Sequence, residues 1–141
     1  MPQEPPFSPT VALLTLSRTW DAALADALKP LGLSTRKYGL LGHIRGTPGI
    51  SFSELARRSR ITVQSAHSTV AAFAAAGLVE DATAHAGAAS RLRVTDAGER
   101  LLAEAAEVVA ALDARFAAVH PGLLDALRAE MEAMVRGATF S

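Results

Sequence analysis

Apolar residues recur at helical spacing over most of the chain, and Pro, Gly and capping residues mark the breaks between the apolar stripes. The stripes predict a helix over about 9–29, a second from 34 or 35, a long one over 96–119, and a last one after a break at 120–122. A Pro-rich arm precedes the first helix, and Ser8 and Thr95 are placed to cap the first and the long helix. On the second helix we expect Tyr38, Leu41 and Ile44 to face inward. The apolar stripes of the other three helices consist of Val11, Leu14, Leu16, Trp20, Leu24, Leu28, Leu101, Ala105, Val108, Leu112, Phe116, Val119, Leu123, Leu124, Leu127, Met131, Met134 and Val135.

The stretch over 51–94 has a different pattern, which predicts two short helices joined by a tight turn and then a β-hairpin. Ser51 and Glu54 have capping-box spacing, in which the Ser hydroxyl accepts from the N–H of Glu54 and the Glu carboxylate accepts from the N–H of Ser51. Thr62 is placed to cap the second short helix, and Gly77 to end it in the left-handed conformation. This order of elements is typical of a helix-turn-helix with a wing. The apolar positions expected inward here are Leu55, Ala56, Ile61, Leu92 and Val94.

The second short helix divides its residues by face. Its apolar stripe consists of Ala66, Val70, Phe73 and Ala74, whereas Gln64, His67, Ser68 and Ala71 follow the i, i+3, i+4, i+7 pattern on another face. Short polar side chains on a helix that packs by its other face suit insertion into the major groove of DNA. A plain amphipathic surface helix explains the same pattern, so the helix alone leaves both interpretations open.

Composition limits the possible classes of protein. The 141 residues suffice for one domain, or for one domain with oligomer-forming helices. Half of the residues are hydrophobic but many are Ala, so core volume per residue is low and burial against a second chain is expected. The absence of Cys excludes disulfides, thiolate metal sites and thiol redox sensing. We expect a cytoplasmic protein, because no apolar run reaches membrane-spanning length and the first residues do not resemble a signal sequence.

The formal net charge is zero, but it is unevenly distributed. Residues 34–94 contain eight basic and three acidic residues, a net charge of +5, and the remaining segments carry −5. A basic middle between acidic ends predicts a lobe that faces phosphates. The eight basic residues are Arg36, Lys37, Arg45, Arg57, Arg58, Arg60, Arg91 and Arg93.

Four motifs, in this order and spacing, resemble the MarR family of bacterial transcription regulators: LSTRKYGLLGHI, FSELARRSRIT, AAGLVE and VTDAG. The resemblance covers roughly residues 10–119. It implies a mainly α fold, a winged helix-turn-helix with a small β-hairpin wing. It also implies one domain over 1–141, with a DNA-binding lobe over 34–95 and dimerisation helices over 1–33 and 96–141. The resemblance further implies a homodimer that binds a pseudo-palindromic operator. Many relatives are repressors that leave DNA when a small, often aromatic or phenolic, ligand binds.

The sequence departs from the family pattern at two places that normally contact DNA. Family members usually carry an Asp-Arg pair at the wing tip, which here falls around Ala86, Gly87 and Ala88 with His85 as the nearest polar residue. Ser68 stands where an Arg is common. Three consequences are open: the affinity for DNA is modest, other arginines replace the missing phosphate contacts, or this chain no longer binds DNA strongly. The DNA-binding residues that motif and resemblance together suggest are Arg36, Lys37, Arg57, Arg58, Arg60, Thr62, Gln64, Ser65, His67, Ser68, Arg91 and Arg93.

Trp20, Tyr38 and His43 fall on the first two helices, where MarR-like dimers form a cleft, and an aromatic wall with an imidazole donor suits a phenol or aryl carboxylate. The alternative makes Trp20 an interface anchor and the other two core residues. The four histidines show no metal-ligand spacing, and no nucleophile elbow, phosphate loop or paired-carboxylate motif is present, so neither a metal, a cofactor nor an enzyme is expected. Two functions remain: a ligand-responsive homodimeric repressor, or a winged-helix interaction module with weak or no DNA binding.

Overall fold

The computed structural model describes residues 2–82 and 91–137, and over these residues the chain is a mainly α-helical winged helix-turn-helix, as predicted. The elements are α1 (Pro9–Leu28), the 3₁₀ turn η1 (Lys29–Leu31), α2 (Thr35–Gly46), α3 (Phe52–Ser59), α4 (Val63–Ala75), β1 (Val79–Asp81), β2 (Leu92–Val94), α5 (Asp96–Val119) and α6 (Pro121–Val135). Strands β1 and β2 pair antiparallel, with Glu80 opposite Arg93.

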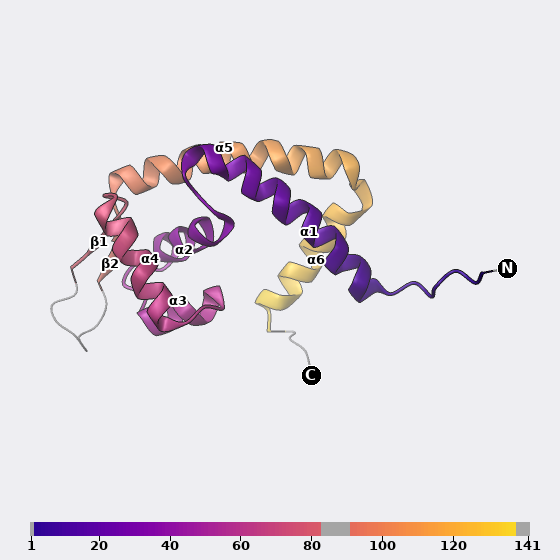
Figure 1. Ribbon diagram of the computed structural model, residues 1–141, viewed down its shortest axis with the longest axis horizontal. Helices are drawn as coiled ribbons and strands as arrows, with labels where there is room; N and C mark the ends of the chain where they lie inside the picture. The colour runs from indigo at the N-terminus through magenta and orange to yellow at the C-terminus, as the bar shows by residue number, and fades with distance from the viewer. Residues whose placement is uncertain (1, 83–90, 138–141) are drawn as a thin grey trace.

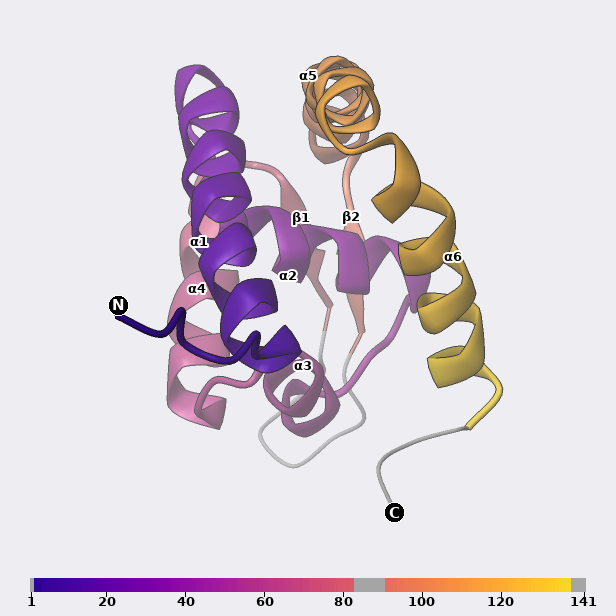
Figure 2. The ribbon, with the colours of Figure 1, turned by 90° about the vertical axis from the view of Figure 1, so that its right-hand side faces the viewer.

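The long helix α5 joins two parts of the molecule (Figure 1). Near its N-terminal end, α2, α3, α4 and the strand pair form the winged-helix lobe, residues 34–95. Farther along α5, the helices α1 and α6 each pack against it, and we call residues 9–28 and 106–135 the helical arm. Figure 2 looks along α5 and shows α1 on one side of it and α6 on the other.

Helix N-termini are capped by the hydroxyl residues that the sequence indicated. The hydroxyl oxygens of Ser8, Ser51, Thr62 and Thr95 each accept a hydrogen bond from a backbone N–H three residues later, at 3.0–3.3 Å. Ser34 caps α2 in the same way. Each cap satisfies a donor that the first turn of a helix otherwise leaves unpaired.

The VTDAG motif forms the joint between the wing and α5. The N–H of Thr95 donates to the carbonyl oxygen of Leu78 at 3.0 Å, and its hydroxyl donates to the carbonyl of Gly77 at 2.6 Å. Gly77 has φ of +75°, as expected for the residue that ends α4. A Cβ added at Gly98 would lie 2.3 Å from the Leu78 oxygen and 2.5 Å from Cγ1 of Val94. Only Gly lets α5 approach the wing this closely.

Buried side chains are concentrated in the winged-helix lobe. Every element of the lobe contributes to one cluster, which Leu28 of α1, Leu33 and two residues of α5 complete. Most inward predictions for the lobe are confirmed. Ala74, which we assigned to the apolar stripe of α4, is exposed, and Leu40, which we did not assign to a stripe, is buried next to Leu41. The buried hydrophobic residues are Leu28, Leu33, Leu40, Leu41, Ile44, Ile50, Leu55, Ala56, Ala66, Val70, Phe73, Val79, Leu92, Val94, Leu102 and Ala105.

The helical arm has no such core within one chain. Helix α6 buries no residue, and the apolar stripe of α1 buries only Leu28. The apolar stripes of these two helices are therefore largely uncovered within one chain. Among the described residues, all but one of the large exposed apolar side chains lie on the arm or its leading segment: Phe7, Val11, Leu13, Leu14, Leu16, Val119, Leu124, Leu127, Met131, Met134 and Val135. The exception is Val63. In the described part of the chain, no helix combines the length and apolarity needed to cross a membrane.

Candidate nucleic-acid interface

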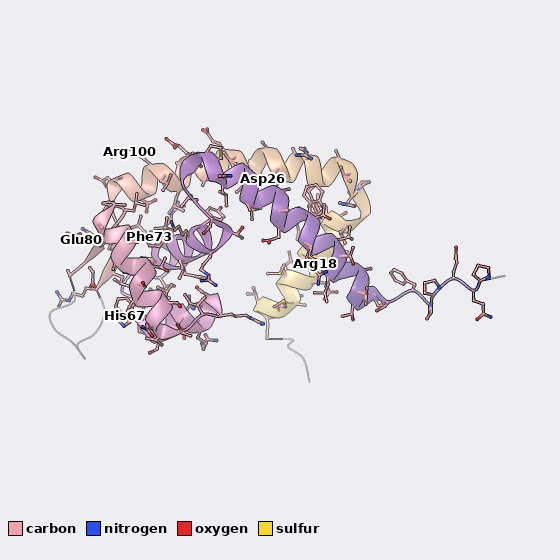
Figure 3. The ribbon with its side chains drawn as sticks, in the orientation of Figure 1. Arg18, Asp26, His67, Phe73, Glu80 and Arg100 are labelled. Atoms are coloured by element: carbon pink, nitrogen blue, oxygen red, sulfur yellow. The ribbon has the colours of Figure 1, made fainter. Side chains whose placement is uncertain are left out.

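Helix α4 presents a polar strip on its outer face. Gln64, His67 and Ser68 are exposed, whereas Val70 and Phe73 on the opposite face are buried. Figure 3 shows His67 at the end of the lobe remote from α5, on which Arg100 is labelled. Because Ala71 and Ala75 continue the exposed strip without bulk, the face is narrow enough to enter a groove.

The first turn of α4 is held by its own hydroxyl groups. The Thr62 oxygen accepts from the N–H of Ser65 at 3.0 Å and donates to the Ser65 hydroxyl at 2.9 Å. Ser65 is half-buried, and its carbonyl accepts from the hydroxyl of Thr69. Of the polar residues predicted on α4, these two are therefore already engaged in the free protein, whereas Gln64 and Ser68 extend outward.

His67 has an aromatic neighbour from α3. Its imidazole lies over the ring of Phe52, with the ring centroids 3.8 Å apart and the planes 17° from parallel. No local sequence pattern indicates this contact, because the two residues are on different helices.

The cations of α3 are held by one carboxylate. Nε of Arg57 and Nε of Arg58 donate to the two oxygens of Glu54 at 2.9 and 2.8 Å, and Arg58 also donates to the hydroxyl of Thr47 at 3.1 Å. Hydrogen bonds from Arg57 and then Arg58 lower the pKa of Glu54 from 4.5 to about 2, and the carboxylate in turn raises the pKa of Arg57. The predicted capping box is thus only half formed, since the Glu54 carboxylate binds guanidiniums rather than the N–H of Ser51. Two cations on one anion leave a net charge of +1 in a fixed place.

Arg60 occupies the turn between α3 and α4. It has φ of +53°, the one non-Gly residue with positive φ in the described part of the chain, and its N–H bonds back to carbonyls of α3. Helix α3 ends at Ser59, and Arg60 is its C-cap residue. Its left-handed conformation carried no sequence signal, because Gly usually marks it.

The wing alternates as predicted. Leu92 and Val94 are buried, and Arg91 and Arg93 are exposed. Arg93 donates to Glu80 on the paired strand at 2.9 Å, a bond between two well-exposed side chains. The family wing-tip positions and His85 lie outside the described residues.

Two further predicted cations lie at the start of α2. Arg36 and Lys37 are exposed in its first turn, which contains no acidic residue. Cations there oppose the helix dipole, so helix stability does not account for them. Arg45, by contrast, pairs with Glu99 of α5 at 3.2 Å. Over residues 2–82 and 91–137, Arg36, Lys37 and Arg60 have no carboxylate within 4.0 Å.

The predicted ligand residues are divided between two places. Trp20 donates its indole N–H to Nε2 of His120 at 3.1 Å and packs edge-on against Phe116, with centroids 5.0 Å apart. It lines an apolar cavity of about 340 Å³ between α1, the end of α5 and α6. Tyr38 and His43 are half-buried on α2 and do not line that cavity. Sequence reasoning treated His120 only as a helix break. Among the described residues, no three His, Asp or Glu side chains are grouped to hold a metal ion.

Comparison with known proteins finds similarity to a family model, to curated relatives and to solved structures. The MarR family model matches residues 31–89. The HTH-type transcriptional repressor Rv2887 of Mycobacterium tuberculosis is 34% identical over 93 residues, which cover 65% of this chain and 67% of that protein. The crystal structure of the M. tuberculosis MarR family protein Rv2887 in complex with DNA superposes with a TM-score of 0.72 at 25% identity, covering 96% of this chain and 100% of that chain. Its complex with p-aminosalicylic acid gives the same TM-score and identity, covering 92% and 98%.

Proposed function

The chain belongs to the MarR family, and from this premise we propose that it is a homodimeric DNA-binding transcriptional repressor whose operator binding is controlled by a small aromatic ligand. The observation that carries the proposal is the polar outer face of α4 within a lobe of net charge +5. MarR family members are transcription regulators and not enzymes. A repressor of this kind acts in the cytoplasm, where bacterial DNA lies.

We assign DNA contacts to three parts of the lobe. Helix α4 enters the major groove and reads base edges through Gln64 and His67, while the start of α2, the turn at Arg60 and the wing contact phosphates. The structurally similar M. tuberculosis protein was crystallised with DNA, which supports the assignment. The proposed set is Arg36, Lys37, Arg57, Arg58, Arg60, Thr62, Gln64, Ser65, His67, Ser68, Arg91 and Arg93.

We assign dimerisation to the segments 1–33 and 96–141, and DNA binding to 34–95. The exposed apolar side chains of the helical arm support this division, because a contiguous apolar surface on one chain marks a protein interface. A second copy would cover this surface and place two α4 helices for successive half-sites.

We place the effector near Trp20, Tyr38 and His43. Because the similar M. tuberculosis protein binds p-aminosalicylic acid, the ligand class is a small aromatic acid or phenol. Trp20 contributes an apolar cavity wall, and Tyr38 and His43 on α2 form the second candidate wall. A thermal-shift screen with salicylates, followed by Y38F and H43A, tests this assignment. Trp20 is the one Trp in the chain, so quenching of its fluorescence by the ligand indicates binding at the cavity that Trp20 lines rather than at Tyr38 and His43.

A salt titration with random-sequence duplex tests the DNA-binding function. We expect the logarithm of affinity to fall with the logarithm of salt concentration with a slope of about −4 to −7, which corresponds to about 4–8 phosphate contacts per dimer. R91A/R93A should make the slope shallower, with R128A on the arm as the matched control. If affinity does not change with salt at micromolar protein, the alternative function, a winged-helix interaction module, is favoured. The pairing of Arg57, Arg58 and Arg93 with carboxylates is the observation that supports this alternative.

A further inference from the structure

The stack of Phe52 on His67 links the two helices of the helix-turn-helix at their exposed surface. Phe52 is the first residue of α3, and His67 faces outward from α4 at the position labelled in Figure 3. A centroid separation of 3.8 Å with nearly parallel planes means that one face of the imidazole is covered. The histidine ring is thereby confined to one orientation on the surface assigned to DNA.

Phe52 provides a fixed support for the imidazole. Its side chain is half-buried and packs against the core of the lobe, whereas His67 is exposed. The nitrogens of an imidazole lie in the ring plane, so stacking covers a face and leaves the hydrogen-bonding edge open. Within the described residues neither ring nitrogen of His67 makes a hydrogen bond. The edge is therefore both oriented and available.

We propose that Phe52 is a positioning residue for DNA recognition, holding the His67 imidazole so that its N–H meets an acceptor atom of the bound duplex. The inference rests on the proposed function and deepens it. A ring that is fixed before binding loses less conformational freedom on the DNA, and the saving is of the order of one immobilised side chain per half-site. The acceptor is a purine N7 or O6 atom or a phosphate oxygen, which share the chemistry of accepting from an imidazole N–H.

A merely structural role predicts a different result from a positioning role. If Phe52 only fastens α3 to α4, its loss weakens DNA binding whether or not residue 67 is His. If it acts through the imidazole, its loss has no further effect once the imidazole is absent. A double-mutant cycle separates the two cases.

The experiment uses the full chain and a duplex that the wild type selects from a random-sequence pool. We expect F52L to weaken binding about three- to tenfold, and H67A to weaken it at least as much. F52L/H67A should bind no more weakly than H67A, and F52Y, which keeps the aromatic face, should bind within about twofold of wild type. An equal fold-loss from F52L in both backgrounds, or no loss from F52L, overturns the proposal.

Two readouts guard against an unfolded variant and identify the acceptor. Ring-current shifts should move the His67 ring protons upfield in wild type and F52Y but not in F52L, and their absence in the wild type overturns the stack itself. Duplexes with 7-deazapurines should lose affinity for the wild type and not for H67A if the acceptor is N7. A salt slope reduced by H67A indicates a phosphate instead. Either result supports the positioning role.

Failure of this inference differs from failure of the proposed function. A wild type that enriches no duplex and binds random DNA independently of salt contradicts the repressor function. A wild type that binds its selected duplex with an additive cycle contradicts only the role of Phe52.

Discussion

The helical arm is the more apolar of the two regions in sequence, yet only the winged-helix lobe buries its apolar side chains within one chain. In the lobe, Leu55 and Ile44 are fully buried, whereas on the arm Val135 is 85% exposed and Met131 57%. The lobe has helices and a strand pair on several sides of one cluster, while α1 and α6 splay from α5 and leave their stripes uncovered. The comparison teaches that an apolar stripe on a helix indicates that its side chains will be buried. It does not indicate whether they are buried within the same chain or against a second one.

The strongest test of this contrast removes a lobe core side chain. We expect L55A to lower the free energy of unfolding by about 2–5 kcal/mol, because a cavity forms where Leu55 is fully buried. The loss should be the same at all protein concentrations, measured by urea denaturation. L13A on the exposed side of α1 is the control, and its loss should depend on protein concentration. Equal, concentration-independent losses would show that the arm closes within one chain.

The joint between the two regions should be nearly as sensitive. G98A is expected to cost about 1–3 kcal/mol, because the new Cβ meets a backbone oxygen and Val94. G42A in α2 is the matched control: a Cβ there meets nothing within 4 Å, so Ala should be neutral or stabilising. Thermal unfolding of both variants measures the difference, and a tolerant G98A would mean that α5 can move away from the wing.

On the arm, a charge should separate chains without unfolding the lobe. L127E places a carboxylate on the apolar cavity wall, and we expect the dimer dissociation constant to rise at least about tenfold. Sedimentation measures this shift, and S53E on the exposed surface of α3 serves as the control. If S53E dissociates the dimer and L127E does not, the interface lies on the lobe.

The smallest effect concerns the charge cluster of α3. The pKa of Glu54 is about 2 in the folded chain and 4.5 ordinarily, so the cluster stabilises the fold above about pH 4.5. That contribution is lost as the pH falls from 4.5 toward 2. The stability of the wild type should therefore approach that of E54Q over this interval, followed by thermal unfolding against pH. A difference that stays constant over the interval would contradict the ion cluster. The effect is small, because the groups are exposed.

Sequence alone predicted the fold and most element ends, because these depend on local signals. The caps at Ser8, Thr62 and Thr95 and the left-handed Gly77 require only neighbours within a few residues. The alternation of Arg and apolar residues in β2 is likewise local.

The candidate site was predicted as a set of residues but not as an arrangement. Nothing local signals that Phe52 covers His67, that Glu54 holds two guanidiniums in place of its capping bond, or that Trp20 meets His120 one hundred residues away. These contacts depend on how helices cross, which the periodicity of a single helix does not encode.

By itself, then, the sequence determined which residues are helical, where each helix starts, and that the basic charge gathers over 34–94. Tertiary structure alone decided which cations are already paired, which ring supports the imidazole of α4, and which apolar stripes stay open. The physical reason is that hydrogen bonding within a turn is set by adjacent residues, whereas burial and side-chain pairing depend on elements brought together from distant parts of the chain.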